Sequence, residues 1–255
     1  MNSQTISYSS NYFQSSFFET DYRILASVIF ELYRPATVVE FGCGPGHLSR
    51  EFAKLGVQVI AVDGYSQPNF TGFSVEFHRL DLNNPVAIAN FFTNKHFDLA
   101  VCLEVAEHLQ PESSSTLVKW LTQVAPIVIF SAAVPGQGGH GHINLHPREY
   151  WHNEFTQHEF VIADRVREKL RVTSSVAPWY RYNTIDYLQR QHPQAPDSTE
   201  VIPRLIASES ASATGYYQEY DRRFLAELRL KYSPLQFYTP IKQFRQFTKY
   251  LLGRA

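Results

Sequence analysis

The stretch that decides the fold is Val38-Val39-Glu40-Phe41-Gly42-Cys43-Gly44-Pro45-Gly46-His47. Its β-branched and aromatic start is typical of a buried strand, and glycines at every second position then interrupt that strand. Glycine adopts backbone conformations that other residues avoid, and it lets a ligand approach the main chain closely. The stretch therefore predicts a strand that ends in a ligand-binding turn and leads into a helix.

The spacing of these glycines differs from the fingerprint of dinucleotide-binding folds, which is G-x-G-x-x-G. Gly42 and Gly44 fit its start, but His47 occupies the third glycine position and Gly46 comes one residue early. With Glu40 two residues before Gly42, the run reads E-x-G-x-G-x-G. That pattern resembles the first motif of the class I S-adenosylmethionine-dependent methyltransferases.

Apolar strand-like runs alternate with helical stretches downstream of this motif. We expect strands at 37–41, 57–62, 73–80, 97–103, 127–132 and 161–163, a strand-like run at 179–188, and helices at 20–33, 46–55, 84–92, 113–124 and 148–158. Such alternation indicates βαβ units and a parallel sheet. The expected fold is α/β: a doubly wound, Rossmann-like, mainly parallel seven-stranded sheet with flanking helices, plus a helical C-terminal extension.

Three parts are expected along the chain. Residues 1–19, which are rich in aromatic residues, form an N-terminal lid or arm; 20–188 form the methyltransferase domain; 189–255 form a linker and a basic helical extension. From Arg222 onward, eight arginines and lysines face a single acid, Glu227. A basic amphipathic helix of this kind can lie on a membrane or contact an acidic partner. We favour packing on its own domain or on a second subunit of an oligomer.

The overall composition does not indicate a particular class of binding partner. Lys plus Arg (23) nearly balance Asp plus Glu (24), so no global charge calls for nucleic acid. The polar start of the chain lacks the pattern of a signal peptide, and the longest apolar run is too short to span a bilayer. Cys43 and Cys102 are the two cysteines, which fits a reducing cytoplasm rather than a disulfide framework.

Acidic residues follow several of the expected strands. Ligands of doubly wound sheets bind beyond the carboxyl ends of the strands, so these acids are expected at one site. Glycine N–H groups would meet the methionine carboxylate, Glu40 the ammonium group and Asp63 the ribose hydroxyls, and the family resemblance adds Asp81-Leu82 at the adenine. The residues expected to bind S-adenosylmethionine are Glu40, Gly42, Cys43, Gly44, Gly46, Asp63, Gly64, Asp81, Leu82, Leu103 and Glu104.

The segments after the fourth and fifth strands carry the candidate chemistry. Glu104-Val-Ala-Glu107-His108, the Gly/His-rich run from Ser131 to Asn144, Tyr150-Trp151 and Trp179-Tyr-x-x-Asn183 resemble motifs of bacterial methyltransferases of glycan and secondary-metabolite pathways. An imidazole suits proton removal from an attacking hydroxyl. We take His142 as the general base, with His108 as second candidate. His140, Asn144 and Trp151 are expected at the substrate.

A metal is the alternative at this site. Glu104, Glu107, His108 and His142 could hold Mg²⁺, Mn²⁺ or Zn²⁺, and E-x-x-E-H resembles the metal site of small-RNA 2′-O-methyltransferases and of ubiquinone-pathway O-methyltransferases. We favour a site without a metal. The expected function is cytoplasmic O-methylation of a small molecule or glycan intermediate. One rival is methylation of an RNA end; the core lacks a basic patch for nucleic acid, though the basic tail could compensate. The other rival is a non-catalytic cofactor-binding scaffold.

Overall fold

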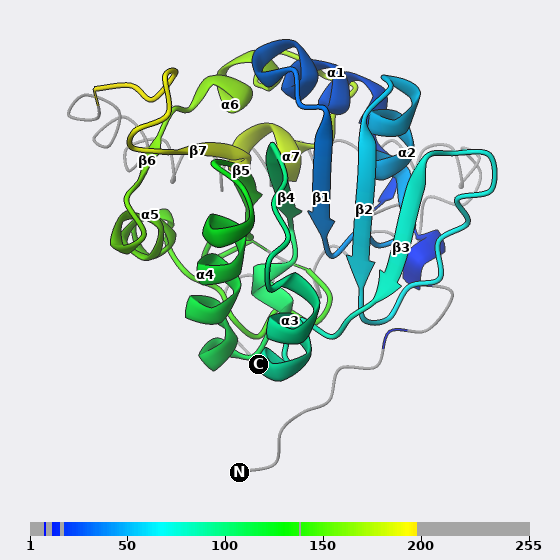
Figure 1. Cartoon of the computed structure of the whole chain (residues 1–255), viewed down its shortest axis with the longest axis horizontal. Coiled ribbons are helices and arrows are strands. Elements are labelled where there is room, and N and C mark those ends of the chain that lie inside the picture. Colours follow the sequence, from blue (N-terminus) through cyan, green and yellow to red (C-terminus); the bar gives the residue numbers. More distant parts are fainter. Residues whose placement is uncertain (1–7, 9–11, 16–17, 138, 198–255) are drawn as a thin grey trace, which may run out of the picture. The chain divides into compact units, whose positions relative to one another are not determined.

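The computed structural model describes residues 8, 12–15, 18–137 and 139–197, and its centre is one seven-stranded sheet (Figure 1). The strand order is β3-β2-β1-β4-β5-β7-β6. The strands are β1 (Thr37–Phe41), β2 (Gln58–Asp63), β3 (Val75–Arg79), β4 (Leu99–Leu103), β5 (Ile127–Ser131), β6 (Phe160–Ile162) and β7 (Ile185–Gln189). This arrangement confirms the predicted doubly wound fold.

The first five strands are parallel, and β7 runs antiparallel to both β5 and β6. The arrows of β1, β2 and β3 in Figure 1 end at the same edge of the sheet. The chain order reverses between β1 and β4, which lie side by side in the sheet. In a doubly wound sheet, a ligand binds beyond the carboxyl ends at such a reversal.

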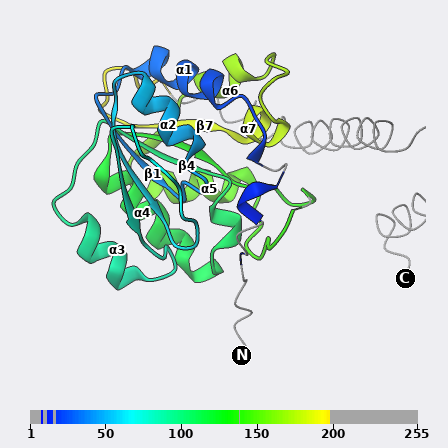
Figure 2. The same ribbon diagram turned by 90° about the vertical axis from the view of Figure 1, so that its right-hand side faces the viewer.

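Helices cover both faces of the sheet, as Figure 2 shows. The helices are α1 (Tyr22–Tyr33), α2 (His47–Lys54), α3 (Pro85–Phe92), α4 (Ser114–Val124), α5 (Arg148–Gln157), α6 (Arg165–Leu170) and α7 (Pro178–Asn183). One apolar core joins the sheet to α3, α4 and α5, and a second joins it to α1, α2, α6 and α7. Because both faces are covered, the central strands β4 and β5 are buried along their whole length.

The helix ends follow from local sequence chemistry. The Asp21 carboxylate accepts a hydrogen bond from the Ile24 N–H at the start of α1, and Arg34 ends that helix in a left-handed conformation. The Asn84 side chain caps α3 by accepting from the Ala87 N–H, with proline at the first helical position. These ends agree with the helices predicted at 20–33 and 84–92.

The predicted strand-like run at 179–188 is wrong in its first half, which forms helix α7, and helix α6 was not predicted. Pro178 takes the first helical position of α7, where its fixed φ and missing N–H do no harm. Tyr180 then packs into the core that joins α1, α2 and α6 to the sheet. Aromatic residues suit strands as well as buried helices, so this short run gave no periodicity to separate the two.

The expected C-terminal extension lies almost entirely outside the described residues, because these end at 197. Its basic helix, its packing and any membrane or partner contact therefore remain predictions. Within the described part of the chain, no helix is both long and apolar enough to cross a membrane.

Candidate functional site

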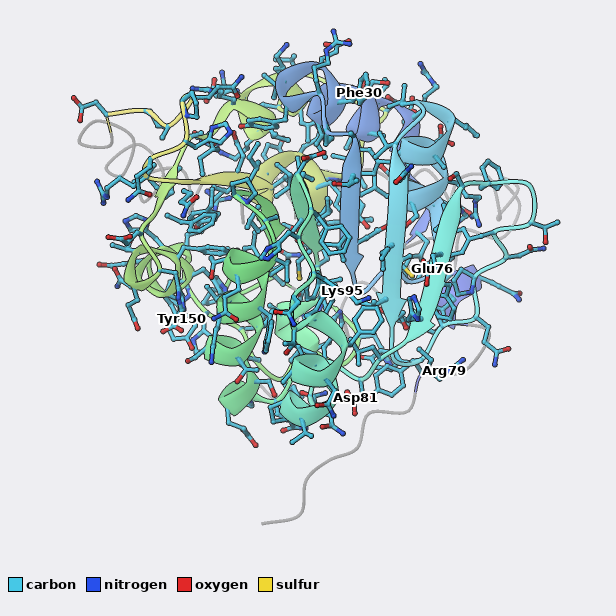
Figure 3. All side chains as sticks on the ribbon, in the orientation of Figure 1. Phe30, Glu76, Arg79, Asp81, Lys95 and Tyr150 are labelled. Atoms are coloured by element: carbon cyan, nitrogen blue, oxygen red, sulfur yellow. The ribbon has the colours of Figure 1, made fainter. Side chains whose placement is uncertain are left out.

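A partly open cavity lies over the carboxyl ends of β1, β2 and β4, and its empty volume is about 1280 Å³ including open solvent. Ten of the eleven residues expected at the cofactor line it, and Gly46 is the exception. Gly46 instead precedes α2 with φ +76°, and an added Cβ would lie 2.4 Å from the Phe70 ring. Figure 3 shows Asp81 with Arg79 at the end of the sheet toward which β2 and β3 run.

Asp63 accepts hydrogen bonds from two turns that line this cavity, the glycine turn after β1 and the turn after β2. Its Oδ1 accepts hydrogen bonds from the N–H groups of Tyr65 (2.8 Å) and Ser66 (2.7 Å), and its Oδ2 accepts from Gly44 N–H (2.9 Å). A carboxylate has about four acceptor positions, so Asp63 keeps capacity for a ligand hydroxyl. Its side chain is therefore held in a fixed orientation at the cavity wall.

The N–H groups of the glycine turn already donate hydrogen bonds within the protein. Gly42 and Cys43 donate to Val62 O (2.8 and 3.1 Å), Gly44 donates to Asp63, and Gly46 donates to Cys43 O (2.9 Å). The expectation that these groups meet a ligand carboxylate is therefore wrong, because β2 and the turn itself already use them. Glycine is needed here for space: a Cβ on Gly42 would lie 2.4 Å from Val105.

Glu40 is a buried carboxyl group at the end of β1. It is 6% exposed, and the Ser49 hydroxyl donates a hydrogen bond to it. Burial raises the pKa of Glu40 to about 8, and the Ser49 hydrogen bond opposes that rise only in part. Its proposed contact with the ligand ammonium group remains a proposal.

The opposite wall brings together Glu107, His108 and His142, which we call the acceptor cluster. One ligand atom of each residue lies within 4.8 Å of the others, and the two imidazole rings are 5.0 Å apart. The main-chain N–H groups of Ile143 and Asn144 both donate to Glu107 O, at 2.9 and 3.0 Å. These two bonds hold the glycine- and histidine-rich loop against the turn after β4.

Burial sets the protonation of the acceptor cluster. Glu107 is fully buried, and neither of its oxygens has a hydrogen-bond partner at normal distance among the described residues. Desolvation and then the charge of Glu104 raise the pKa of Glu107 well above its usual range; nearby backbone N–H groups oppose this only in part. Desolvation lowers the pKa of His108 to about 4 and also lowers the pKa of His142. Both imidazoles are therefore neutral near pH 7.

Glu104 lies outside that cluster although it lines the same cavity. Its carboxylate accepts from Gln137 Nε2 (3.0 Å) and Asn183 Nδ2 (3.3 Å), and the Asn183 amide also donates to Gln137 Oε1 (2.8 Å). Burial raises the pKa of Glu104 to about 6. Of the four candidate metal ligands, the structure thus gathers Glu107, His108 and His142, while Glu104 is held by amides.

Two of the three expected substrate residues do not reach the cavity. Asn144 is 2% exposed, and its amide donates to Ala106 O (3.0 Å) and Ser114 Oγ (2.9 Å), so it anchors the loop. Trp151 is 3% exposed and packs 5.1 Å from the Phe130 ring in the core beneath α5. The expectation of substrate contacts at Asn144 and Trp151 is therefore wrong, whereas His140 lines the cavity.

Aromatic side chains of the N-terminal arm form part of the cavity lining. The ring of Tyr12 lies 5.4 Å from that of His140, and the ring of Tyr8 lies 5.9 Å from that of His108. The remaining lining residues that sequence reasoning did not assign to the site include Tyr22, His47, Tyr65, Asn83, Gln137 and Gly139. Of these, His47 ends the glycine-rich stretch that decides the fold, and Gln137 and Gly139 fall within the glycine- and histidine-rich loop; the sequence had marked both runs without assigning these residues to the site.

The cavity residues fit an S-adenosylmethionine molecule. Polar groups occur in the order that its adenine, ribose and amino-acid parts require: Asp81 follows β3, Asp63 ends β2, and Glu40 lies one residue before the end of β1. Apolar Leu82 and Leu103 line the same cavity. Asp81 Oδ1 accepts a hydrogen bond from Asn83 N–H (2.9 Å), and the carboxylate keeps acceptor capacity for a ligand amine.

Comparison with known proteins gives one family and several relatives. The family model described as "Methyltransferase domain" matches residues 19–161, more than half of the chain. A ubiquinone biosynthesis O-methyltransferase of Colwellia psychrerythraea is 32% identical over 104 residues, which cover 37% of this chain and 40% of the relative. A trans-aconitate 2-methyltransferase of Mycobacterium tuberculosis is 32% identical over 107 residues, covering 41% and 39%.

The chain thus aligns with about two fifths of the length of these curated relatives. Among solved structures, the sugar N-methyltransferase KedS8 of Streptoalloteichus superimposes with a TM-score of 0.54 at 12% identity. The match covers 75% of this chain and 96% of KedS8, and it supports the same fold.

Proposed function

This chain belongs to the methyltransferase-domain family, and on that premise we propose that it transfers a methyl group from S-adenosylmethionine to a hydroxyl oxygen of a small molecule. The predicted methyltransferase class and the predicted S-adenosylmethionine cofactor are confirmed. The oxygen acceptor, the small-molecule or glycan-intermediate substrate, the cytoplasmic location and the residue roles are the proposal.

One observation carries the choice of acceptor chemistry: the acceptor cluster lines the same cavity as the cofactor residues. S-adenosylmethionine, when bound, supplies an electrophilic methyl group, so the protein must position a nucleophile and remove its proton. Because the pKa of His142 is lowered, its ring is neutral and can accept a proton at nitrogen. His142 is the proposed base; His108 is the second candidate, and its Nδ1 lies 3.3 Å from Gly141 O.

The walls of the cavity also support a small acceptor. The Tyr8 ring lies edge-on to that of His108 and the Tyr12 ring is tilted against that of His140, which limits the space beside the acceptor cluster. The two curated relatives bear the names of an O-methyltransferase in ubiquinone biosynthesis and of a trans-aconitate 2-methyltransferase. Both names refer to small-molecule chemistry, which agrees with the proposed substrate class.

A second candidate is favoured by the buried carboxyl group of Glu107. A buried carboxyl group beside two neutral imidazoles is a donor set that a divalent cation takes. In that case Glu107, His108 and His142 would hold the metal, which would lower the pKa of the acceptor hydroxyl. The metal-assisted alternative includes methylation of an RNA end.

The test is incubation of the full chain with methyl-labelled S-adenosylmethionine and fractionated host metabolites, with mass spectrometry to locate the methylated atom. We expect label on an oxygen of a small molecule, and loss of turnover in His142→Ala with unchanged S-adenosylhomocysteine affinity. Label in RNA, or on nitrogen or carbon, would overturn the proposed acceptor. A His142→Ala variant with full turnover would overturn the assigned base, and absence of label in every fraction would favour a scaffold.

A further inference from the structure

The amino-acid end of the cofactor lacks the partners that the glycine turn was expected to supply. The N–H groups of Gly42, Cys43, Gly44 and Gly46 are all used within the fold. The carboxylate of S-adenosylmethionine still needs hydrogen-bond donors, because an unpaired carboxylate is costly to enclose. Side chains that line the cavity together with Glu40 can supply such donors.

We propose that His47, positioned by Arg50, binds the carboxylate of the cofactor, with the hydroxyl pair of Tyr22 and Tyr180 as a second donor. This inference rests on the proposed binding of S-adenosylmethionine in the cavity. His47, Tyr22 and Tyr180 all line that cavity together with Glu40. Sequence reasoning assigned none of them a role in binding this carboxylate.

The hydrogen bond from Arg50 determines which ring nitrogen of His47 carries the proton. Arg50 Nη2 lies 2.6 Å from His47 Nδ1. A guanidinium group can only donate, so Nδ1 accepts and the proton of the neutral ring sits on Nε2. Arg50 is itself fixed, because Nη1 donates to Asn69 O (3.1 Å) and its guanidinium group lies over the Phe70 ring. His47 therefore offers a pre-oriented Nε2–H donor.

The two tyrosines supply the second donor. Their hydroxyl oxygens are 3.3 Å apart, so one O–H donates to the other oxygen and one O–H is left for a ligand. Burial raises the pKa of both groups well above its usual value, which keeps both hydroxyls protonated. The ring of Tyr22 also lies 5.3 Å from that of His47, so the two donors are neighbours.

The distribution of basic groups points to the same place. Among the described residues that line the cavity there is no lysine or arginine, and histidine is the only basic type. His108, His140 and His142 lie on the side of the cavity near Tyr8 and Tyr12, whereas His47 is the first residue of α2. The N-terminal end of α2 adds a partial positive charge beside His47, and no side chain caps it.

The test compares two ligands that differ by the carboxylate alone: S-adenosylhomocysteine and its decarboxylated analogue. Calorimetry on the full chain gives the preference of the wild type and of each variant for the first ligand over the second. We expect His47→Leu to weaken S-adenosylhomocysteine at least about tenfold while leaving the analogue within about twofold. His47→Gln, which keeps an N–H donor near the same position, should recover part of the preference.

The outcomes separate this inference from the proposed function. If the wild type binds neither ligand, cofactor binding in this cavity fails. If the wild type prefers S-adenosylhomocysteine and His47→Leu keeps the same preference, the role of His47 is overturned. Asp81→Asn is the matched control at the adenine end of the cavity, and we expect it to weaken both ligands by the same factor. Arg50→Met should shift the preference in the direction of His47→Leu, because it removes the guanidinium group that orients the ring.

Discussion

Gly139 gives the sharpest test of where His142 must sit. A Cβ added at Gly139 would lie 2.1 Å from His142 Cε1 and 2.2 Å from Nε2, whereas ordinary contact begins at 3.4 Å. The imidazole must therefore move by about 1.3 Å in Gly139→Ala. The three atoms nearest to that Cβ all belong to the His142 ring.

The expected effect falls on catalysis rather than on stability. Displacing a catalytic group by about 1 Å costs on the order of 100-fold in rate, and losing a general base costs about 100- to 10,000-fold. We therefore expect kcat of Gly139→Ala to fall at least about 100-fold, with an unchanged melting temperature, because a side chain that can rotate relieves the clash at little cost.

The assay is a double-mutant cycle with His142→Ala, measured by initial rates of methyl transfer and by S-adenosylhomocysteine affinity. If Gly139 acts only through His142, the double variant should be no slower than His142→Ala alone. Independent, multiplicative losses would refute the reasoning, and so would a Gly139→Ala enzyme with wild-type kcat.

Three further outcomes are expected. The pKa of Glu40 is raised from 4.5 to about 8, so the folded protein holds a proton that the unfolded chain releases above pH 4.5. The stability of the wild type should therefore fall between pH 5 and 8, and Glu40→Gln should reduce that fall when thermal unfolding is followed against pH. Parallel curves of melting temperature against pH for the two proteins would contradict this prediction. Trp151→Ala should lower the unfolding free energy by about 3–5 kcal/mol in urea titration, because the ring is buried in the core; a rise in acceptor KM without lost stability would restore its substrate role. Extensive chelation should leave turnover within about twofold, and a complete loss that Mg²⁺, Mn²⁺ or Zn²⁺ restores would instead favour the metal-assisted alternative.

The sheet and the cofactor side of the cavity could be predicted because both depend on local pattern. Apolar runs mark parallel strands, and the carboxyl ends of such strands meet at one edge, so Asp63 and Asp81 could be assigned before any coordinates existed. The glycine turn shows the limit of that reasoning. Its composition indicated freedom of the backbone, but only the structure shows that Val62 and Asp63 already bind its N–H groups.

The remaining site features depend on contacts distant in sequence. The amide pair that holds Glu104 comes from Gln137 and Asn183, which lie 33 and 79 residues away along the chain. The aromatic arm reaches His108 and His140 from the N-terminus. Trp151 was misassigned because a motif marks a residue without saying whether it faces a cavity or the core. The hydrophobic periodicity of the sequence does not show which distant residues will touch, or whether a side chain faces the cavity or the core.

A crystal structure of the full chain with S-adenosylhomocysteine tests the central claim most directly. The account predicts the adenine beside Asp81, the ribose hydroxyls at Asp63, and the sulfur facing the wall that carries Glu107, His108 and His142. Nucleoside density elsewhere on the protein, or a sulfur turned away from that wall, would contradict it.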